Sequence, residues 1–221
     1  MFGTIAPKYD FITRVFSYGM DRGWKRMAVA RTALPPRAAV LDLACGTGDL
    51  GKLAAARYSG AHIVAADLTE SMLHLAKIPD CACADAADLP FRTGCFDAVF
   101  VGYGLRNFPR LTAALEEVRR VLKPGGLLVS LDFFLPARPW LRHLYLAYLY
   151  AQGAFWGLIL HGRARVYTYI PDSLRSFLSA EKFSLLLENT DFTEVTAHKF
   201  LLGGIAVHWA KKSPLPGADI Q

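Results

Sequence analysis

Val40-Leu-Asp-Leu-Ala-Cys-Gly-Thr-Gly-Asp-Leu50 joins a short apolar run to a helix-compatible segment through two glycines that are one residue apart. This order predicts a strand that ends in a tight turn and continues as the N-terminus of a helix. Because glycine has no Cβ, Gly46 and Gly48 permit the sharp turn and allow a ligand to approach the backbone. The stretch therefore predicts an α/β fold with a nucleotide-binding corner.

The charges at this corner indicate which ligand it favours. Gly46, Gly48 and Gly51 match the Gly-x-Gly-x-x-Gly pattern of dinucleotide sites, which is a weak signal alone. Asp42 and Asp49 would repel a pyrophosphate at this corner but would attract a cation. S-adenosylmethionine carries an ammonium and a sulfonium for these carboxylates, and its own carboxylate suits the backbone N–H groups. We expect it as the ligand; the alternative is a plain strand-to-helix turn capped by an Asp.

Composition limits the class of protein. Hydrophobic residues make up 53% of the 221 residues, so an apolar partner is expected, and the chain is long enough for one full domain. The net charge of +6 is spread over the chain, which favours an anionic membrane surface over nucleic acid as a partner. The four cysteines fit neither a disulfide scaffold nor a metal site. Without a signal peptide pattern, we expect a cytoplasmic chain that contacts the membrane surface from outside, and a homodimer is the oligomeric state to test.

Residues 1–36 precede the first strand. Apolar residues three and four positions apart predict one helix that is interrupted near Pro7 and a second from Asp21 to Leu34. Pro35-Pro36 ends the second helix. These residues are expected to form a helical lid over the ligand or, equally, to pack on the core.

The second strand supplies a strong candidate for ligand binding. His62–Ala66 is expected to be a strand that ends at Asp67, 21 residues after Gly46. This spacing is close to the interval at which an acidic side chain accepts both ribose hydroxyls. Leu68 follows directly and is included in the site, and Met72 on the next helix would press on an adenine ring or lie in the core.

The βα alternation continues after this strand and predicts a doubly wound, mostly parallel sheet. A third strand should end at Asp85-Ala86, where the carboxylate is placed to accept the adenine amino group. A fourth should end at Gly102–Asn107, at the edge of the sheet where ligands collect. The expected elements are strands Cys81–Ala84 and Phe96–Val101, helix Leu111–Leu122 and strand Leu127–Phe133.

Residues 137–170 form an apolar helical insert. The 17 residues from Leu144 to Leu160 carry no formal charge, which approaches the length of a membrane span. Gln152, two glycines and interleaved aromatic rings argue against a span. We expect a helix that shapes an apolar pocket or rests on a bilayer interface; the alternative is a cap that completes the core. Four arginines flank the insert and would meet lipid headgroups: Arg138, Arg142, Arg163 and Arg165.

The C-terminal part predicts a helix followed by an antiparallel hairpin. The helix is Ala180–Asn189, and the strands are Thr193–Leu201 and Ile205–Ala210, joined at Gly203-Gly204. Residues 213–221 are expected to be a disordered tail.

Several motifs together resemble one family. They are Asp42–Leu50, Leu89-Pro-Phe91, Gly104-Leu-Arg-Asn107, Arg120–Gly126, the opening Met1–Asp10 and Gly204–His208. They resemble the class I methyltransferases of ubiquinone and menaquinone biosynthesis, the UbiE type, over nearly the whole chain. The resemblance implies a Rossmann-like single domain over 1–212 that transfers a methyl group from S-adenosylmethionine to a ring carbon of a prenylated quinol.

The resemblance also implies site residues. Thr47, Asp67, Asp85 and Ala86 would contact S-adenosylmethionine, and Tyr9 would close over it. The family commonly has Ser where this chain has Gly102, so only backbone can serve there. The chain is also shorter than the family pattern between residues 77 and 83, and it has Thr190-Asp191-Phe192 where Ala-Gly-Phe is usual.

The mechanism requires help in forming a phenolate, because a ring carbon is a poor nucleophile until its neighbouring hydroxyl is deprotonated. Arg106 is the predicted catalytic residue, since a fixed positive charge lowers the pKa of a phenol; the alternative is a structural ion pair with an Asp. Tyr103 and Asn107 are expected to orient the ring, and Tyr167 lines the pocket or lies in the core. Three histidines are weaker candidate bases: His161, His198 and His208.

Two other functions stay open from the sequence. One is methylation of another hydrophobic molecule at oxygen or nitrogen. The other is a non-catalytic module that binds S-adenosylmethionine or an isoprenoid, although an intact cofactor site argues against it.

Overall fold

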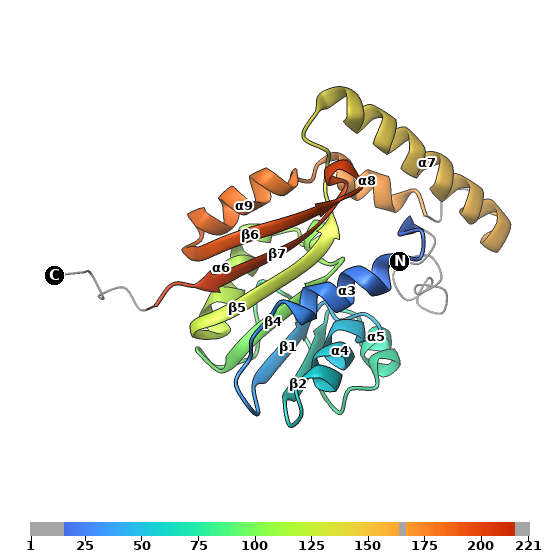
Figure 1. Ribbon diagram of the computed structural model, residues 1–221. Helices are drawn as coiled ribbons and strands as arrows, with labels where there is room; N and C mark the ends of the chain where they lie inside the picture. The colour runs from blue at the N-terminus through green and yellow to red at the C-terminus, as the bar shows by residue number, and fades with distance from the viewer. Residues whose placement is uncertain (1–15, 164–166, 215–221) are drawn as a thin grey trace.

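The computed structural model describes residues 16–163 and 167–214. Seven strands form one sheet in the order β3-β2-β1-β4-β5-β7-β6. All neighbours pair in parallel except β7, which is antiparallel to both β5 and β6. Helices cover both faces of the sheet, with α7 and α8 at one end (Figure 1). The sheet is doubly wound and mostly parallel with a C-terminal antiparallel hairpin, as the sequence predicted.

The elements follow the predicted alternation. The first half contains α3 (Asp21–Ala30), β1 (Ala39–Leu43), α4 (Asp49–Arg57), β2 (His62–Asp67), α5 (Glu70–Ala76), β3 (Asp80–Cys83), β4 (Phe96–Gly102) and η2 (Leu105–Asn107). The second half contains α6 (Leu111–Val121), β5 (Leu122–Phe133), α7 (Pro139–His161), α8 (Tyr169–Arg175), α9 (Ala180–Asn189), β6 (Phe192–Phe200), η4 (Leu201–Gly203) and β7 (Ile205–Lys212).

Two large apolar layers, one on each face of the sheet, make up most of the core, and a small third cluster lies beside α5. Successive residues of a strand point to opposite faces, so Val40 of β1 belongs to one layer and Leu41 to the other. The layer with Val40 includes Trp24 of α3 and Leu149 of α7. The layer with Leu41 includes side chains from α6 and α9. Burial on both faces explains why the central strands are nearly continuous apolar runs.

Some predicted boundaries were wrong. The helix predicted from Asp21 to Leu34 ends at Ala30, and its N-cap residue is Met20 rather than Asp21. The strand predicted to begin at Leu127 begins at Leu122, because Lys123–Gly126 lie within β5 beside an irregularity in its pairing with β4. A local sequence pattern does not show such an irregularity, since only the neighbouring strand reveals the register. The other strand ends differ by one or two residues.

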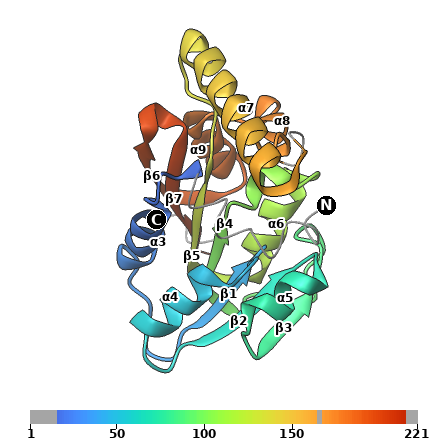
Figure 2. The ribbon, with the colours of Figure 1, turned by 90° about the vertical axis from the view of Figure 1, so that its right-hand side faces the viewer.

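The apolar insert is one helix of 23 residues, α7. It is fixed to the body at two points where a glycine permits close contact. A Cβ at Gly153 would lie 2.9 Å from the carbonyl oxygen of Tyr167, and one at Gly204 would lie 2.7 Å from the ring of Tyr145. Tyr145 also donates a hydrogen bond to the carbonyl of Gly204 at 2.9 Å. Figure 2 shows α7 lying along the outside of the molecule beside α8.

None of the helices within the described residues is long and apolar enough to cross a membrane. The first predicted helix and the predicted tail lie mostly outside the described residues, and the domain limits stay predictions.

Candidate active site

A cleft opens at the carboxyl ends of β1, β2 and β4. In an open α/β sheet this edge collects ligands, most often where the strand order reverses, as it does between β1 and β4. The lining residues are Leu43, Ala44, Gly46, Asp67, Leu68, Thr69, Met72, Ala84, Asp85, Ala86, Gly102, Tyr103, Gly104, Asn107, Phe108 and Pro109.

The glycine turn after β1 forms one wall of the cleft. Gly46 and Gly48 have φ values of 53° and 78°, in the left-handed region that favours glycine. A Cβ at Gly104 would lie 2.7 Å from the Cβ of Ala44, so a glycine there allows the turn after β4 to approach the turn after β1. The predicted need for glycine at the turn is confirmed.

Asp67 stands at the end of β2 with both carboxylate oxygens oriented by the backbone. Gly46 donates its N–H to Oδ2 at 3.0 Å, and Thr69 donates its N–H to Oδ1 at 2.9 Å. A carboxylate oxygen accepts more than one hydrogen bond, so each oxygen retains capacity for a ribose hydroxyl. The structure thus joins the glycine turn and the acidic residue into one unit, an arrangement that fits the nucleoside part of S-adenosylmethionine.

Asp42 and Thr47 lie on a second, smaller cavity beneath the turn rather than on the cleft. The Asp42 side chain is buried and accepts the N–H of Gly51 at 2.8 Å. Burial raises the pKa of Asp42 to about 7. Asp49, the other carboxylate expected to attract a cation, is paired with Lys25 at 2.7 Å. Asp42 therefore supports the first turn of α4 in this structure, and its direct contact with the cofactor stays a prediction.

Asp85 and Ala86 line the cleft just after the end of β3, the strand next to β2. Oδ1 of Asp85 accepts the N–H of Ala87 at 2.9 Å, and Oδ2 accepts Nη2 of Arg110 at 3.1 Å. These two donors hold the pKa of Asp85 below its usual value, so the side chain is ionised at neutral pH. An ionised carboxylate is a suitable acceptor for an adenine amino group.

The structure brings most of the predicted site residues to the cleft. Those that line it are Gly46, Asp67, Leu68, Met72, Asp85, Ala86, Gly102, Tyr103 and Asn107. Those that do not line it are Asp42, Thr47, Gly48, Arg106 and Tyr167. Tyr9 lies outside the described residues.

Gly102 lies against Leu50 of α4. A Cβ at this position would lie 2.9 Å from Cδ1 of Leu50, whose side chain is buried. The buried Leu50 side chain thus occupies the space that a larger residue at position 102 would need. This packing explains why the chain has glycine rather than the expected Ser at position 102.

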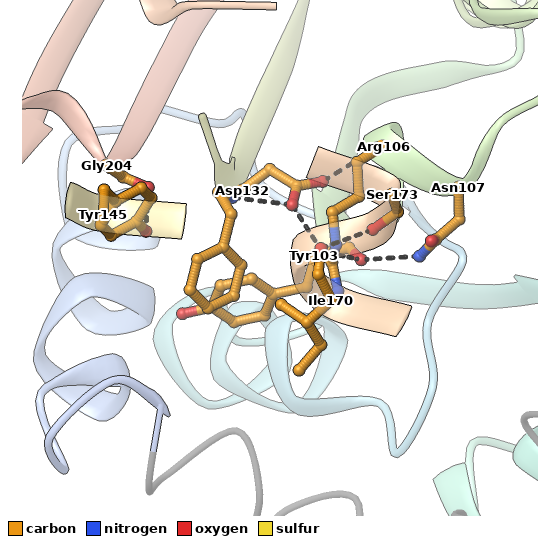
Figure 3. Close-up of polar contacts among 9 residues, drawn as sticks. Tyr103, Arg106, Asn107, Asp132, Tyr145, Ile170, Ser173 and Gly204 are labelled. Atoms are coloured by element: carbon orange, nitrogen blue, oxygen red, sulfur yellow. Dashed lines mark hydrogen bonds and ion pairs between the residues drawn. The ribbon is translucent and has the colours of Figure 1, made fainter. Parts of the chain in front are cut away.

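Tyr103 adopts an uncommon backbone conformation for a residue other than glycine, with φ at 58°. Its ring is buried and packs on that of Phe133, with a centroid distance of 5.3 Å. Its carbonyl accepts hydrogen bonds from Arg106 at 2.8 Å and from Asn107 at 3.4 Å (Figure 3). The turn after β4 is therefore held by the side chains that follow it.

Arg106 forms a buried ion pair. Its Nη1 lies 2.7 Å from Oδ1 of Asp132 on β5, and the two side chains are 3% and 0% exposed (Figure 3). Burial raises the pKa of Asp132, and Arg106 opposes that rise. Tyr169 of α8 also hydrogen-bonds to Arg106. The geometry agrees with the structural ion pair that was the alternative for Arg106, and its catalytic role stays a prediction.

Tyr167 and the described candidate histidines lie away from the cleft. The Tyr167 side chain is fully buried in the core layer that includes Leu149, which favours the core alternative. His208 on β7 lies between the rings of Phe134 and Phe183, and burial lowers its pKa to about 4. His198 is packed against Phe200 on β6. The side chain of His161 is outside the described residues.

Sequence reasoning missed several residues of the cleft: Leu43, Ala44, Thr69, Ala84, Gly104, Phe108 and Pro109. Most directly adjoin a predicted site residue, so a rule that includes the neighbours of each strand end would have found them. Phe108 and Pro109 are the more informative omission, because they add an apolar wall next to Asn107.

Comparison with known proteins agrees with this geometry. A family model described as the ubiE/COQ5 methyltransferase family matches residues 1–212. The Ubiquinone/menaquinone biosynthesis C-methyltransferase UbiE of Syntrophotalea carbinolica is 37% identical over 227 residues, which cover 98% of this chain and 94% of that protein. The demethylmenaquinone methyltransferase of Thermus thermophilus is 38% identical over 218 residues, which cover 94% of this chain and 98% of that protein.

Solved structures share the fold at low sequence identity. A putative methyltransferase from Bacillus halodurans has a TM-score of 0.63 at 19% identity, covering 86% of this chain and 98% of that chain. A SAM-dependent methyltransferase from Thermotoga maritima has a TM-score of 0.63 at 17% identity, covering 93% and 95%. These likenesses show a Rossmann-like methyltransferase fold.

Proposed function

Because this chain belongs to the ubiE/COQ5 methyltransferase family, we propose that it methylates a ring carbon of a prenylated quinol in quinone biosynthesis. The chain is an S-adenosylmethionine-dependent methyltransferase. The proposed acceptor is demethylmenaquinol or a ubiquinol precursor, the classes that the relatives' names indicate for those proteins.

One observation carries the proposal: the cleft has two chemically different sides. One side presents the carboxylates of Asp67, which is bound to the glycine turn, and of Asp85, and these suit the ribose and adenine of S-adenosylmethionine. The other side presents Tyr103, Asn107 and the apolar pair Phe108-Pro109, which suits a flat aromatic ring with few polar groups. A donor and an acceptor of these kinds would meet near Gly102.

The residues of this chain are proposed to act mainly by alignment. S-adenosylmethionine supplies an activated methyl group, so the protein must hold the ring carbon in line with the carbon–sulfur bond. We propose that Tyr103 and Asn107, which both line the cleft, orient the ring. We propose that Arg106 is a positioning residue, because Asp132 neutralises its charge and its Nη1 binds the carbonyl of Tyr103. It would then fix the turn that carries the acceptor side of the cleft.

The finer partner and location statements are also proposals. A prenylated quinol resides in a membrane, so the protein would work as a peripheral membrane protein on the cytoplasmic side. A homodimer is the other proposed state; light scattering of the purified protein would report its mass directly.

The test is methyl transfer with an isotopic donor. The purified protein is incubated with ¹³C-methyl S-adenosylmethionine and, separately, demethylmenaquinol, a ubiquinol precursor and a naphthoquinol without a prenyl chain, all under reducing conditions. The proposal expects the labelled carbon on a ring carbon, as read by carbon–proton NMR correlations and product mass. Label on oxygen, or cofactor binding without transfer to any of these acceptors, would overturn it and favour another hydrophobic acceptor.

A further inference from the structure

The outward face of α7 carries a continuous stripe of apolar side chains. Five large ones are each more than half exposed: Trp140, Leu144, Phe155, Leu158 and Ile159. Ala147 and Ala151 are exposed between them. The intervals of three and four residues place all of these on one side of a helix that is about 34 Å long. Soluble proteins rarely leave such a large contiguous apolar surface uncovered, which indicates a partner.

The charges around this stripe specify the partner. Residues 133–171 contain no Asp or Glu but contain Arg138, Arg142, Arg163 and Arg165. Arg138 and Arg163 are exposed and lie just beyond the two ends of α7. A surface that is apolar along its length and basic at its ends is complementary to a layer with an apolar interior and anionic headgroups.

The stripe is held in a fixed direction. On the inward side of α7, Gly153 contacts the backbone of Tyr167 and Tyr145 binds Gly204. The inner face is therefore attached to the protein at two points, and the outer face cannot turn inward without breaking these contacts. Leu202, in the turn between β6 and β7 next to Gly204, adds a further apolar side chain that is 78% exposed.

We propose that the outer face of α7 is a lipid-docking face that lies flat on an anionic bilayer surface. The proposal rests on the proposed function, because a prenylated acceptor would be extracted from that bilayer. Beyond the proposed function, it identifies the surface that contacts the bilayer and the orientation of α7 on it. A second copy of this chain is the less suitable occupant, because two such faces would bring arginines together with no carboxylate on α7 to pair with them.

Docking in this manner would place the cleft close to the bilayer. α7 leads into α8, and Tyr169 of α8 hydrogen-bonds to Arg106, whose side chain holds the carbonyl of Tyr103 in the cleft wall. In Figure 1, α7 and α8 lie beyond the carboxyl end of β5, the same end of the sheet at which the cleft opens. A quinol ring would have only a short path from lipid to the acceptor side.

The experiment measures co-sedimentation of the full chain with vesicles of phosphatidylcholine alone and of phosphatidylcholine with 30% phosphatidylglycerol. The apolar variant is Leu144→Gln/Phe155→Gln/Leu158→Gln, because Gln keeps the helix propensity of α7. Its control is Leu75→Gln/Leu185→Gln, which replaces exposed leucines on α5 and α9. The charge variant is Arg138→Gln/Arg163→Gln, with Arg92→Gln, another exposed arginine, as its control. Thermal unfolding and S-adenosylhomocysteine affinity report whether each variant is folded.

The proposal expects the wild type to bind the anionic vesicles. The apolar variant should bind at least about tenfold more weakly, and the charge variant about fivefold more weakly with the loss removed at high salt. Both controls should bind as the wild type does.

Three results would overturn the docking face: no binding by the wild type, equal binding by all variants, or a wild-type dimer that the apolar variant converts to monomer. Vesicle binding without methylation of any quinol would contradict the proposed function alone, and methylation without vesicle binding would contradict the docking face alone.

Discussion

Asp67 and Asp132 are both carboxylates at the carboxyl ends of strands, but they differ in their exposure and in the groups that bind them. Asp67, in the half formed by β1 to β4, is held by two backbone N–H groups and lines the cleft. Asp132, in the half formed by β5, β6 and β7, is fully buried against Arg106. The Asp67 carboxylate is available to a ligand, whereas the Asp132 carboxylate is buried against its ion-pair partner. Changes in the first should cost binding, and changes in the second should cost stability.

The largest effect is expected from Arg106→Met, which leaves the carboxylate of Asp132 buried without its partner. The free energy of unfolding should fall by roughly 3–5 kcal/mol, as measured by urea denaturation. The double variant Arg106→Met/Asp132→Leu removes both charges and should recover most of that loss. If Arg106→Met were as stable as the wild type but had lost turnover, Arg106 would instead be the catalytic cation. The Asp132–Arg106 pair would then not be a structural one.

The next effect concerns His208, which is buried in the antiparallel half. Its pKa is lowered from 6.5 to about 4 in the folded chain, so the unfolded chain binds more protons between these two pH values. Stability should therefore fall as the pH falls through this window, by about 3 kcal/mol in total from this residue. His208→Leu does not titrate, so the difference between its pH profile and that of the wild type isolates the effect. Parallel profiles would contradict the buried neutral state.

The smallest effect is expected from Arg110→Gln in the half formed by β1 to β4. The Arg110–Asp85 pair is exposed, and exposed pairs stabilise proteins by less than about 1 kcal/mol. The melting temperature should change little, and the affinity for S-adenosylhomocysteine should change by less than about fivefold. A large loss of stability would show that the exposed Arg110–Asp85 pair also has a structural role, like the buried Arg106–Asp132 pair.

The sequence predicted the parallel half well because its signals are local. A strand followed by a glycine turn and an acidic residue at the next strand end are short patterns with a direct physical reason. Glycine at 46 and 48 and the position of Asp67 could therefore be predicted from residues close together in the chain. The helix Ala180–Asn189 was also predicted to the residue, and in the structure Ser179 is its N-cap.

The antiparallel half was harder to predict because its contacts join distant residues. Nothing local links Arg106 to Asp132, and the choice between a catalytic and a structural role for Arg106 needed the register of β4 beside β5. The same holds for Tyr167, which is covered by α7. Asp42 is an exception in the parallel half, because the local pattern did not show that its carboxylate is buried and bound to the N–H of Gly51. Burial is a property of the packed molecule, and for these residues it decided the outcome.

The central claim is that the β1–β4 edge binds S-adenosylmethionine through Asp67. The most direct measurement is the affinity of S-adenosylhomocysteine for the wild type, for Asp67→Ala and for Asp80→Ala, by titration calorimetry. Asp80 is the matched control, an exposed carboxylate on β3 that pairs with His62. Asp67→Ala should bind S-adenosylhomocysteine about 100-fold or more weakly than the wild type, since the hydrogen bonds from the two ribose hydroxyls to a charged acceptor disappear. Affinity equal to that of Asp80→Ala would contradict the claim.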